Sequence, residues 1–344
     1  MFEDSKLAEL LLKEVQKERR YRYVRMFFFG LFMAINMLIF LTIRSGLNSS
    51  ESGNISERIY KVIHRGYTAD KKEEAVIAIL PLYGTIGMTT SGSNIDISEE
   101  IVKMALERIR QNPKIKAVVL KIQSPGGAVL PTDKIYQMLK ERLAGVKLVT
   151  YVDGLAASGG YYLALAGENI AVHPLSFVGN IGVVMQIYNV SGLAEKIGFK
   201  VYTFKSGKLK DMGNPFRALT PEEDELFSGL VGEMQKTFVS RVLESRGKRV
   251  NRANLPLITD GRIFSPQHAK KLGLIDEIDT FDGMLNSLTK KLGEDKYSKF
   301  TVVEYRIRMG FLNSMFGKFE KFLGVDIEKE LLNRRTPELL YLCC

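Results

Sequence analysis

The chain has 344 residues, a formal net charge of +10, 26% charged residues and 45% hydrophobic residues. This composition indicates a globular chain, and the basic excess raises nucleic acid or an anionic membrane as partners. The two cysteines are adjacent, at Cys343 and Cys344, and there are three histidines. We therefore exclude a disulfide-stapled fold, a cysteine zinc site and an internal catalytic cysteine, and little room is left for a histidine-based metal site or triad.

The first predicted element is a transmembrane helix. Residues Met26 to Ile43 carry no charge and, as a helix, nearly span a hydrocarbon core. Basic residues are concentrated before this stretch, and TIRSGLNSS after it contains no small-x-small cleavage site. The positive-inside rule predicts an uncleaved anchor with a cytoplasmic N-terminus. A buried core helix is the alternative.

Composition divides the chain into five segments. We predict a cytoplasmic segment at 1–25, the anchor at 26–43, a linker at 44–74, one large domain at 75–285 and a C-terminal extension at 286–344. Within the large domain, apolar runs typical of buried strands alternate with helical patterns. This alternation favours an α/β fold with a mostly parallel sheet and crossover helices.

The predicted elements of the domain follow in chain order. The strands are expected at 75–86, 114–122, 147–153, 169–174, 177–189, 200–207 and 274–278. The helices are expected at 97–111, 131–143, 156–166, 192–197, 221–245 and 266–272. The stretch from Asn169 to Ala194 has no formal charge, and we favour a buried sheet region over a second membrane span because polar residues and glycines interrupt it.

Three short motifs are candidates for chemistry. SPGG, at 124–127, directly follows a predicted strand; it is either a tight turn or a pair of glycines that point N–H groups at an anion. In AASGGYY, at 156–162, Ser158 is either a helix N-cap or a nucleophile at a strand-to-helix turn. KSGKLKD, at 205–211, is either a solvated basic loop or the source of a lysine base.

Together with GNIG, DGRIF and AKKLGLIDE further along, these motifs resemble the signal peptide peptidase A family of serine–lysine proteases, in its short, single-repeat bacterial form. The resemblance covers roughly residues 75 to 285. It implies a ClpP/crotonase-like β-superhelix with flanking helices, and ring-shaped homo-oligomers with active sites near the subunit interfaces. It also implies a mechanism that needs no metal and no cofactor.

The resemblance also implies residue roles. Ser158 matches the nucleophile and Lys210 the general base, although the residues alone do not distinguish Lys210 from Lys205 or Lys208. Gly126, Gly127 and Gly159 match backbone donors to an oxyanion. A free lysine has a pKa of about 10.4, so a lysine base requires apolar surroundings that lower its pKa. The uncharged stretches around Ser158 are expected to supply them.

One position departs from the family pattern, and one segment lies beyond it. Asn180 stands where the family commonly has a serine that holds the lysine amine; its amide oxygen can accept a hydrogen bond, so we expect the role to survive. The tail RRTPELLYLCC is apolar at its end. It either packs on the body or enters the substrate groove of a neighbouring copy.

We therefore expect a membrane-anchored serine endopeptidase of the bacterial inner membrane, with its catalytic domain on the extracytoplasmic side. The resemblance implies remnant signal peptides as substrates. The alternatives are a related inner-membrane peptidase with other substrates, a crotonase-fold acyl-CoA enzyme, and an inactive scaffold. The positive charge is spread along the chain and is dense only beside the anchor, which favours a membrane surface over nucleic acid.

Overall fold

A computed structural model describes much of the chain. The described residues are 54–64, 73–87, 97–293, 297–308 and 340–342. The predicted cytoplasmic segment and anchor, residues 1–43, lie outside them. Within the described ranges, no helix has the length and apolarity that crossing a bilayer requires. The chain divides into two compact units, Met1–Gly53 and Asn54–Cys344, and the second contains all the elements below.

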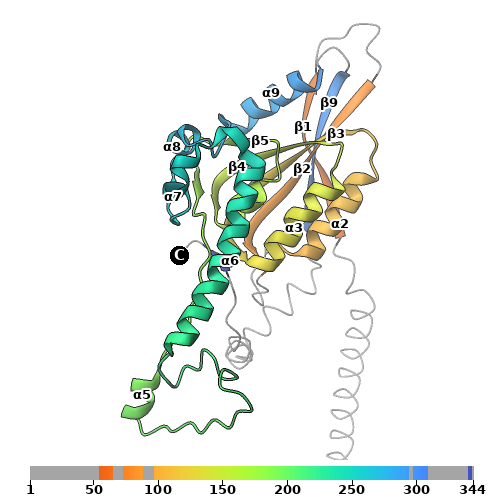
Figure 1. Ribbon diagram of the computed structural model, residues 1–344. Helices are drawn as coiled ribbons and strands as arrows, with labels where there is room; N and C mark the ends of the chain where they lie inside the picture. Colours follow the sequence, from red (N-terminus) through yellow and green to blue (C-terminus); the bar gives the residue numbers. More distant parts are fainter. Residues whose placement is uncertain (1–53, 65–72, 88–96, 294–296, 309–339, 343–344) are drawn as a thin grey trace, which may run out of the picture. The chain divides into compact units, whose positions relative to one another are not determined.

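The strands and helices of this unit alternate along the chain (Figure 1). The strands are β1 Asn54–His64, β2 Glu73–Ile86, β3 Ile115–Ala128, β4 Lys147–Ala157, β5 Asn169–Val172, β6 Phe177–Gly179, β7 Ile263–Phe264, β8 Glu277–Ile278, β9 Tyr297–Arg308 and β10 Leu340–Leu342. The α-helices are α2 Glu99–Arg110, α3 Val129–Arg142, α4 Gly159–Ala164, α5 Ser191–Lys196, α6 Pro221–Arg246, α7 Leu255–Ile258, α8 Pro266–Lys271 and α9 Phe281–Gly293. Two short 3₁₀ helices, Gly247–Arg249 and Arg252–Asn254, follow α6.

The strands form one mixed sheet, which confirms the predicted α/β class. Its main path has the order β1-β9-β2-β3-β4-β5-β8. All neighbours on this path are parallel except β1 and β9. The first part of β4 pairs with β5, and its last three residues, Leu155 to Ala157, pair with β6. β6 in turn pairs antiparallel with β7. The carboxyl end of β4 thus leaves the main path at the residues that precede Ser158.

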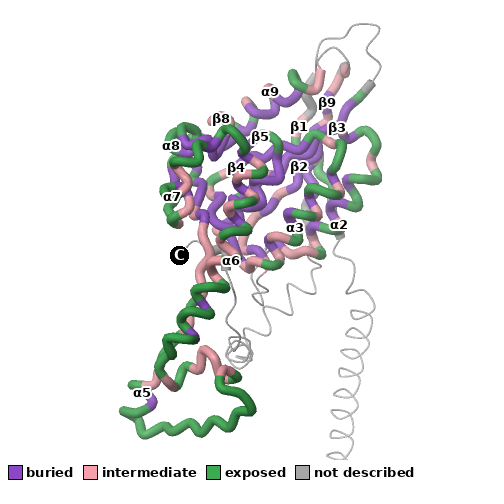
Figure 2. The backbone as a smooth tube through the Cα atoms, viewed as in Figure 1, coloured by how far each residue is buried: buried purple, intermediate pink, exposed green. Residues whose placement is uncertain are grey.

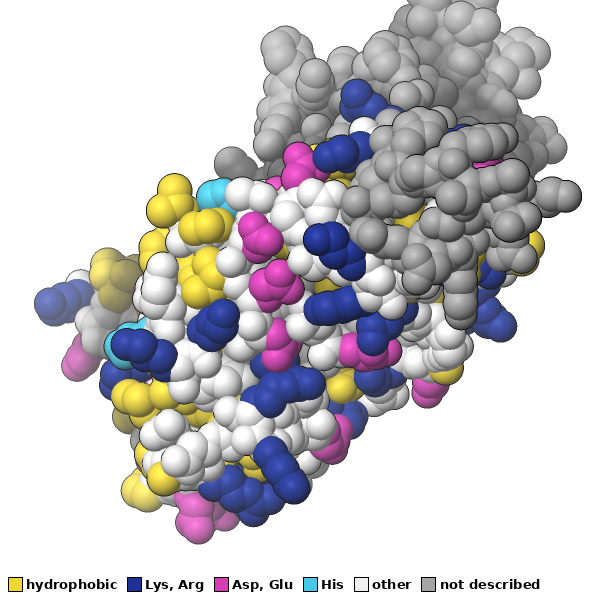
Figure 3. Space-filling view, turned by 90° about the horizontal axis from the view of Figure 1, so that it is seen from above, with side chains coloured by type: hydrophobic (Ala, Val, Ile, Leu, Met, Phe, Trp, Pro, Cys, Tyr) yellow, Lys and Arg dark blue, Asp and Glu magenta, His cyan; other side chains and the backbone are white. Residues whose placement is uncertain are grey.

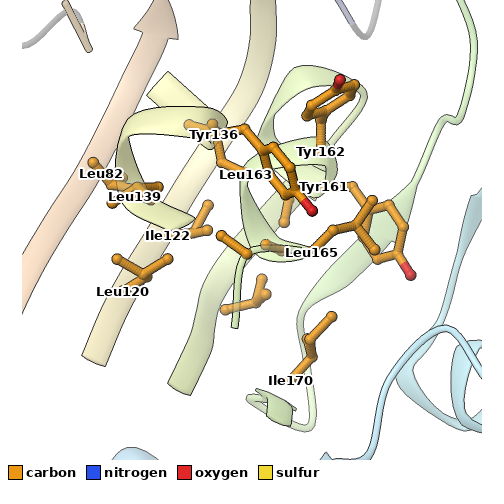
Figure 4. Close-up of a cluster of buried hydrophobic side chains, with 14 of the residues drawn as sticks. Leu82, Leu120, Ile122, Tyr136, Leu139, Tyr161, Tyr162, Leu163, Leu165 and Ile170 are labelled. Carbon is orange, nitrogen blue, oxygen red and sulfur yellow. The ribbon is translucent and has the colours of Figure 1, made fainter. Parts of the chain in front are cut away.

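Both faces of the sheet are buried. Alternate residues of β2 and β3, among them Leu82, Leu120 and Ile122, pack with α2, α3 and α4 on one face (Figure 4). The other set, including Ile79 and Val119, packs against α9. Burial on both faces explains why β2 and β3 have continuous apolar runs rather than an alternating pattern.

The sheet is wider than the predicted domain. β1 lies in the segment predicted as a linker, and β9 lies in the segment predicted as a C-terminal extension, yet the two pair along their length. Their sequences, NISERIYKVIH and YSKFTVVEYRIR, alternate charged with apolar residues. Charged residues are common on strands near a sheet edge, and we predicted neither segment to be a strand.

Three local predictions were wrong. SPGG is not a free turn, because β3 continues through it to Ala128, with irregular register against both neighbours. Residues 200–207 form no strand and are exposed. Only the first three residues of the predicted strand 177–189 are in the sheet. Residues 200–207 have no sheet partner, and beyond Gly179 the other segment has only a single bridge, at Val184, so most of their β propensity is not used.

A buried ion pair joins α6 to the segment before β8. The Arg246 guanidinium donates to both carboxylate oxygens of Asp276, at 2.9 and 2.8 Å, and to the Gly273 carbonyl at 2.8 Å. Burial opposes the charged form of Asp276, but hydrogen bonds from Arg246 and from the Ile170 N–H outweigh it, and the pKa of Asp276 lies below its ordinary value. The pair therefore anchors α6 to the end of the sheet.

We predict that Asp276→Ala lowers the free energy of unfolding by about 3–5 kcal/mol, because it leaves the fully buried Arg246 without its counter-charge. The stabilisation by Asp276 is present above the ordinary aspartate pKa of about 3.9 and is lost as the pH falls through the lowered folded-state value. Urea unfolding between pH 3 and 7 measures both effects.

The control is Glu168→Ala, which removes the exposed partner of Lys147 and costs under about 1 kcal/mol. Equal losses in the two variants would show that the buried pair does not anchor α6.

Candidate active site

Ser158 lies at the turn between β4 and α4. The turn is fixed by the backbone: the Ser158 N–H donates to the Gly179 carbonyl at 2.8 Å, and the Tyr162 N–H donates to the Ser158 carbonyl at 2.9 Å. The side chain is inside the molecule, and its hydroxyl donates to the Gly182 carbonyl at 3.4 Å. A serine is thus held by the ends of two strands, β4 and β6.

The backbone of Ser158 has a conformation that side-chain-bearing residues rarely adopt, with φ 53° and ψ −118°. Strain of this kind costs about 1–3 kcal/mol and is concentrated at functional sites. Ser158 precedes α4, yet its side chain makes no capping hydrogen bond. The N-cap interpretation is therefore wrong, and the geometry is that of a strained strand-to-helix turn.

α4 packs against β3 through a glycine contact. A Cβ on Gly160 would lie 2.6 Å from the Ser124 carbonyl oxygen and 3.1 Å from the Ser124 Cβ. Only a glycine allows the helix to approach the strand this closely. The two motifs that the sequence places thirty residues apart, SPGG and ASGGYY, are therefore in direct contact.

The SPGG segment is tied to β2. The buried Ser124 hydroxyl donates to the Gly84 carbonyl at 2.6 Å and accepts from the Gly126 N–H at 3.2 Å. This occupies the Gly126 N–H, one of the three predicted oxyanion donors. A Cβ on Gly127 would overlap the backbone of Ile86, so this position also requires glycine.

Asn180 is beside the nucleophile turn, directly after β6. Its φ is 50°, a left-handed conformation that asparagine tolerates better than most residues. Its side-chain amide donates to the Gly261 carbonyl at 2.5 Å, and its N–H donates to the Arg262 carbonyl at 2.7 Å. The amide group thus holds the DGRIF turn, while its oxygen is the atom that our expectation assigns to the lysine amine.

The three lysines of KSGKLKD differ in their partners. Lys205 is ion-paired to Asp211 at 2.6 Å, and Lys208 is ion-paired to Glu222, whose hydrogen bond and charge raise the pKa of Lys208. Among the residues that the structure describes, Lys210 has no carboxylate partner. The structure thus separates Lys210 from the other two lysines, which the sequence does not.

Lys210 is exposed, on a segment that we call the arm, residues 191–220. The arm lies around the N-terminal end of α6, and both are mostly exposed, in contrast to the sheet (Figures 1 and 2). No hydrogen bond joins Lys210 to Ser158 within the described part of the chain. The described residues of one chain therefore do not form the predicted apolar wall around the lysine.

A cluster of charges holds the arm to α6. Arg217 donates to the carboxylates of both Asp211 and Glu223. Hydrogen bonds from Arg217 and Lys205 hold the pKa of Asp211 well below its usual range. The Arg217 hydrogen bond and the Thr220 N–H lower the pKa of Glu223 to about 2. Both carboxylates are therefore charged at neutral pH.

The C-terminal strand β10 lies beside the glycines. It pairs antiparallel with β3, with Leu340 opposite Ala128, Tyr341 opposite Gly127 and Leu342 opposite Gly126. It also contacts α4. The end of the tail thus packs on the body of its own chain, the first of the two alternatives that the sequence left open.

Sequence reasoning missed several residues that shape the site. The carbonyls of Gly179 and Gly182 fix Ser158, and Gly160 sets the distance between α4 and β3. The signal was available in part, since Gly179 and Gly182 flank Asn180 in GNIG. No motif in the sequence pointed to Arg217, because Asp211 and Glu223 are each six residues away and come close to it only in the folded arm.

Comparisons with known proteins identify the family of the chain. Residues 140–294 match peptidase family S49, and residues 21–208 match the ClpP-like SDH-type serine proteinases. The chain belongs to these serine proteinases, and it is a serine peptidase of family S49. Membership in this family favours a peptidase over the acyl-CoA enzyme considered above.

Two relatives show the extent of the similarity. A putative protease of Methanocaldococcus jannaschii is 35% identical over 224 residues, which are 65% of this chain and 70% of the relative. A putative signal peptide peptidase of Enterococcus faecium is 33% identical over 214 residues, which are 62% of this chain and 61% of the relative. The similarity thus leaves more than a third of this chain unmatched in each case.

We predict that Gly160→Ala lowers kcat by roughly 100-fold, because the added methyl pushes α4 from β3 and displaces Ser158 by a fraction of an ångström or more. Peptide hydrolysis measures the loss. The matched control is Gly229→Ala on α6, where a Cβ meets nothing within 4 Å and activity should not change. Full activity of Gly160→Ala would show that the α4–β3 contact does not set the nucleophile geometry.

Proposed function

We propose that the protein is a membrane-anchored endopeptidase that cleaves apolar peptides, remnant signal peptides above all, with Ser158 as nucleophile and Lys210 as general base. The observation that carries the proposal is the backbone of Ser158, which is strained, buried and free of any capping role. A signal peptide peptidase among the relatives supports the substrate class. A related peptidase with other substrates is the alternative.

The proposed chemistry has two steps. The Ser158 hydroxyl attacks the scissile carbonyl carbon while Lys210 Nζ takes the hydroxyl proton, and the leaving amine then receives that proton as the peptide bond breaks. Water then attacks the ester carbonyl while neutral Lys210 takes its proton, and this proton passes to the Ser158 oxygen as the ester bond breaks, which restores both residues. No other reactant is required by this cycle.

The oxyanion in this cycle is assigned to the N–H groups of Gly127 and Gly159. Gly159 follows the nucleophile at the start of α4, and Gly127 lies on β3, which α4 contacts at Ser124. Gly126 supports them through Ser124 rather than as a free donor. Two N–H groups held in place, one on β3 and one at the start of α4, are suited to stabilise charge in the transition state.

We infer that the dyad forms between two copies in a homo-oligomeric ring. The arm carries eight of the seventeen large apolar side chains that are exposed in the described part of the chain, such as Phe204 at 96% exposure and Tyr202 at 77%. A second exposed group, Leu175, Phe177 and Ile263, lies around β6 and β7, beside the Ser158 turn. The arm of one copy on this patch of another would enclose Lys210 in apolar surroundings and lower its pKa.

This arrangement predicts complementation. Ser158→Ala and Lys210→Ala are each inactive, but a mixture dissociated and reassembled at equal amounts regains roughly a quarter of wild-type activity, because a quarter of the head-to-tail interfaces join an intact serine to an intact lysine. Peptide hydrolysis before and after reassembly measures the gain. A mixture that stays inactive would place both residues of the dyad in one chain.

We also propose that peptides bind as β10 does, as an added strand on β3. Main-chain hydrogen bonds to a sheet edge are a common mode of peptide recognition. β10 pairs with Gly126 to Ala128 and contacts α4, so it covers the edge that a substrate needs. The tail would then compete with substrate.

Deletion of Leu339–Cys344 is therefore predicted to raise peptide turnover by about two- to tenfold, because removing a competitor raises the fraction of open sites. The matched control replaces Cys343 and Cys344 with serine and keeps β10. Steady-state kinetics at low substrate concentration measure the change. Unchanged kinetics in the deletion variant would refute competition by the tail.

The proposed location is the bacterial inner membrane. Residues 26–43, outside the described residues, would anchor the chain with its N-terminus in the cytoplasm and the sheet on the extracytoplasmic side. On the face in Figure 3, basic and acidic side chains are interspersed, with no continuous basic patch. This distribution supports a membrane partner for the basic residues near the anchor over a nucleic-acid surface on that face.

A further inference from the structure

We propose that Arg217 is a positioning residue for Lys210: its guanidinium fixes the turn that carries Lys210 to the first turn of α6. This inference rests on the proposed function, in which Lys210 is the base. It adds a residue outside the dyad and the oxyanion glycines, and it concerns how the arm holds its lysine.

Arg217 binds both the side chain and the backbone of Asp211. Arg217 Nε donates to Oδ2 of Asp211 at 3.0 Å, and Nη2 donates to Oδ1 at 3.1 Å. Nη2 also donates to the Asp211 backbone carbonyl at 2.9 Å. Asp211 is the next residue after Lys210, so fixing both its side chain and its backbone restrains the backbone of Lys210.

Arg217 also binds Glu223, which lies in the first turn of α6. Arg217 Nη1 donates to Oε2 of Glu223 at 2.8 Å, and Nη2 donates to Oε1. Glu223 is itself fixed, because it is buried and forms a capping box with Thr220, with bonds of 2.9 and 3.2 Å. A planar guanidinium spans both carboxylates, which the single ammonium of a lysine does not.

The arm has little else to hold its shape. Of its apolar residues, only Ala194 is fully buried, and its aromatic side chains are largely exposed. Without a local apolar core, the turn depends on the Arg217 contacts, on the ion pairs of Lys205 with Asp211 and of Lys208 with Glu222, and on short-range backbone bonds. Arg217 is 30% exposed but Glu223 is fully buried, so loss of the arginine charge should also lower the melting temperature, and the pH–rate profile is the readout that separates geometry from unfolding.

Geometry governs a lysine base in two ways. The amine must come within hydrogen-bond reach of the serine hydroxyl, and it must be neutral. A lysine on a loosened turn samples better solvated positions, where the charged form is favoured and its pKa moves towards about 10.4. Loss of the Arg217 contacts should therefore lower kcat and move the rising limb of the pH–rate profile to higher pH.

The test uses the full-length protein in detergent and an apolar reporter peptide. Arg217→Gln and Arg217→Lys are compared with Arg142→Gln, which removes an equally exposed arginine from an ion pair with Glu107 on the body. Glu223→Gln provides a milder variant, because glutamine keeps the capping box while the ion pair is lost. Readouts are kcat, KM, the pH profile, the melting temperature and the mass of the assembly.

We expect roughly a 10- to 100-fold loss of kcat in both Arg217 variants, with KM and assembly mass retained and the rising limb shifted to higher pH. Glu223→Gln should show the same shift with a smaller loss, and Arg142→Gln should match wild type. Wild-type-like kinetics of either Arg217 variant, or a loss that only follows dissociation of the assembly, overturns the proposal. Inactive wild type, or activity that survives in Ser158→Ala, instead refutes the proposed function.

Discussion

The site depends on one strained turn, where β4 ends and α4 begins. Ser158 is held in a left-handed conformation because its N–H is bound by the Gly179 carbonyl and because Gly160 packs on the backbone of Ser124. These contacts require three strand ends to meet: those of β3, β4 and β6. In our account the width of the sheet, its two buried faces and the Arg246–Asp276 anchor keep those ends in place, and they thereby hold the proposed nucleophile.

The arm that carries the proposed base, Lys210, is held by ion pairs rather than by apolar packing. Ser158 lies within an apolar body, whereas Lys210 lies on an exposed arm whose shape is set by ion pairs and a helix cap. An exposed lysine is a poor base, and a strained serine without a base is a poor nucleophile. Assembly resolves both deficiencies at once in our account: the apolar surface of the arm is buried, the lysine is desolvated, and the serine acquires a proton acceptor. Activity would then be confined to the assembled protein.

The sequence predicted the class of fold, most of the helices and the residue of the strained turn, because buried strands and paired glycines leave strong patterns. It did not predict β1 and β9, whose charged alternation resembles a linker, or the loss of strand structure at 200–207, where the apolar residues have no sheet partner. The contact between Gly160 and Ser124 and the bridge from Arg217 to Glu223 were also out of reach. Both are set by tertiary approach, on which local residue pattern carries no information.

The most direct test of the account is a cross-link between Ser158→Cys and Lys210→Cys in a chain whose Cys343 and Cys344 are replaced by serine. A short thiol-specific cross-linker is added to the assembled double variant, and the products are separated by mass under denaturing conditions. The account predicts a ladder of dimers and higher multimers, because each linked pair joins two copies. A product that remains a single chain, cross-linked internally, would contradict the formation of the dyad between copies.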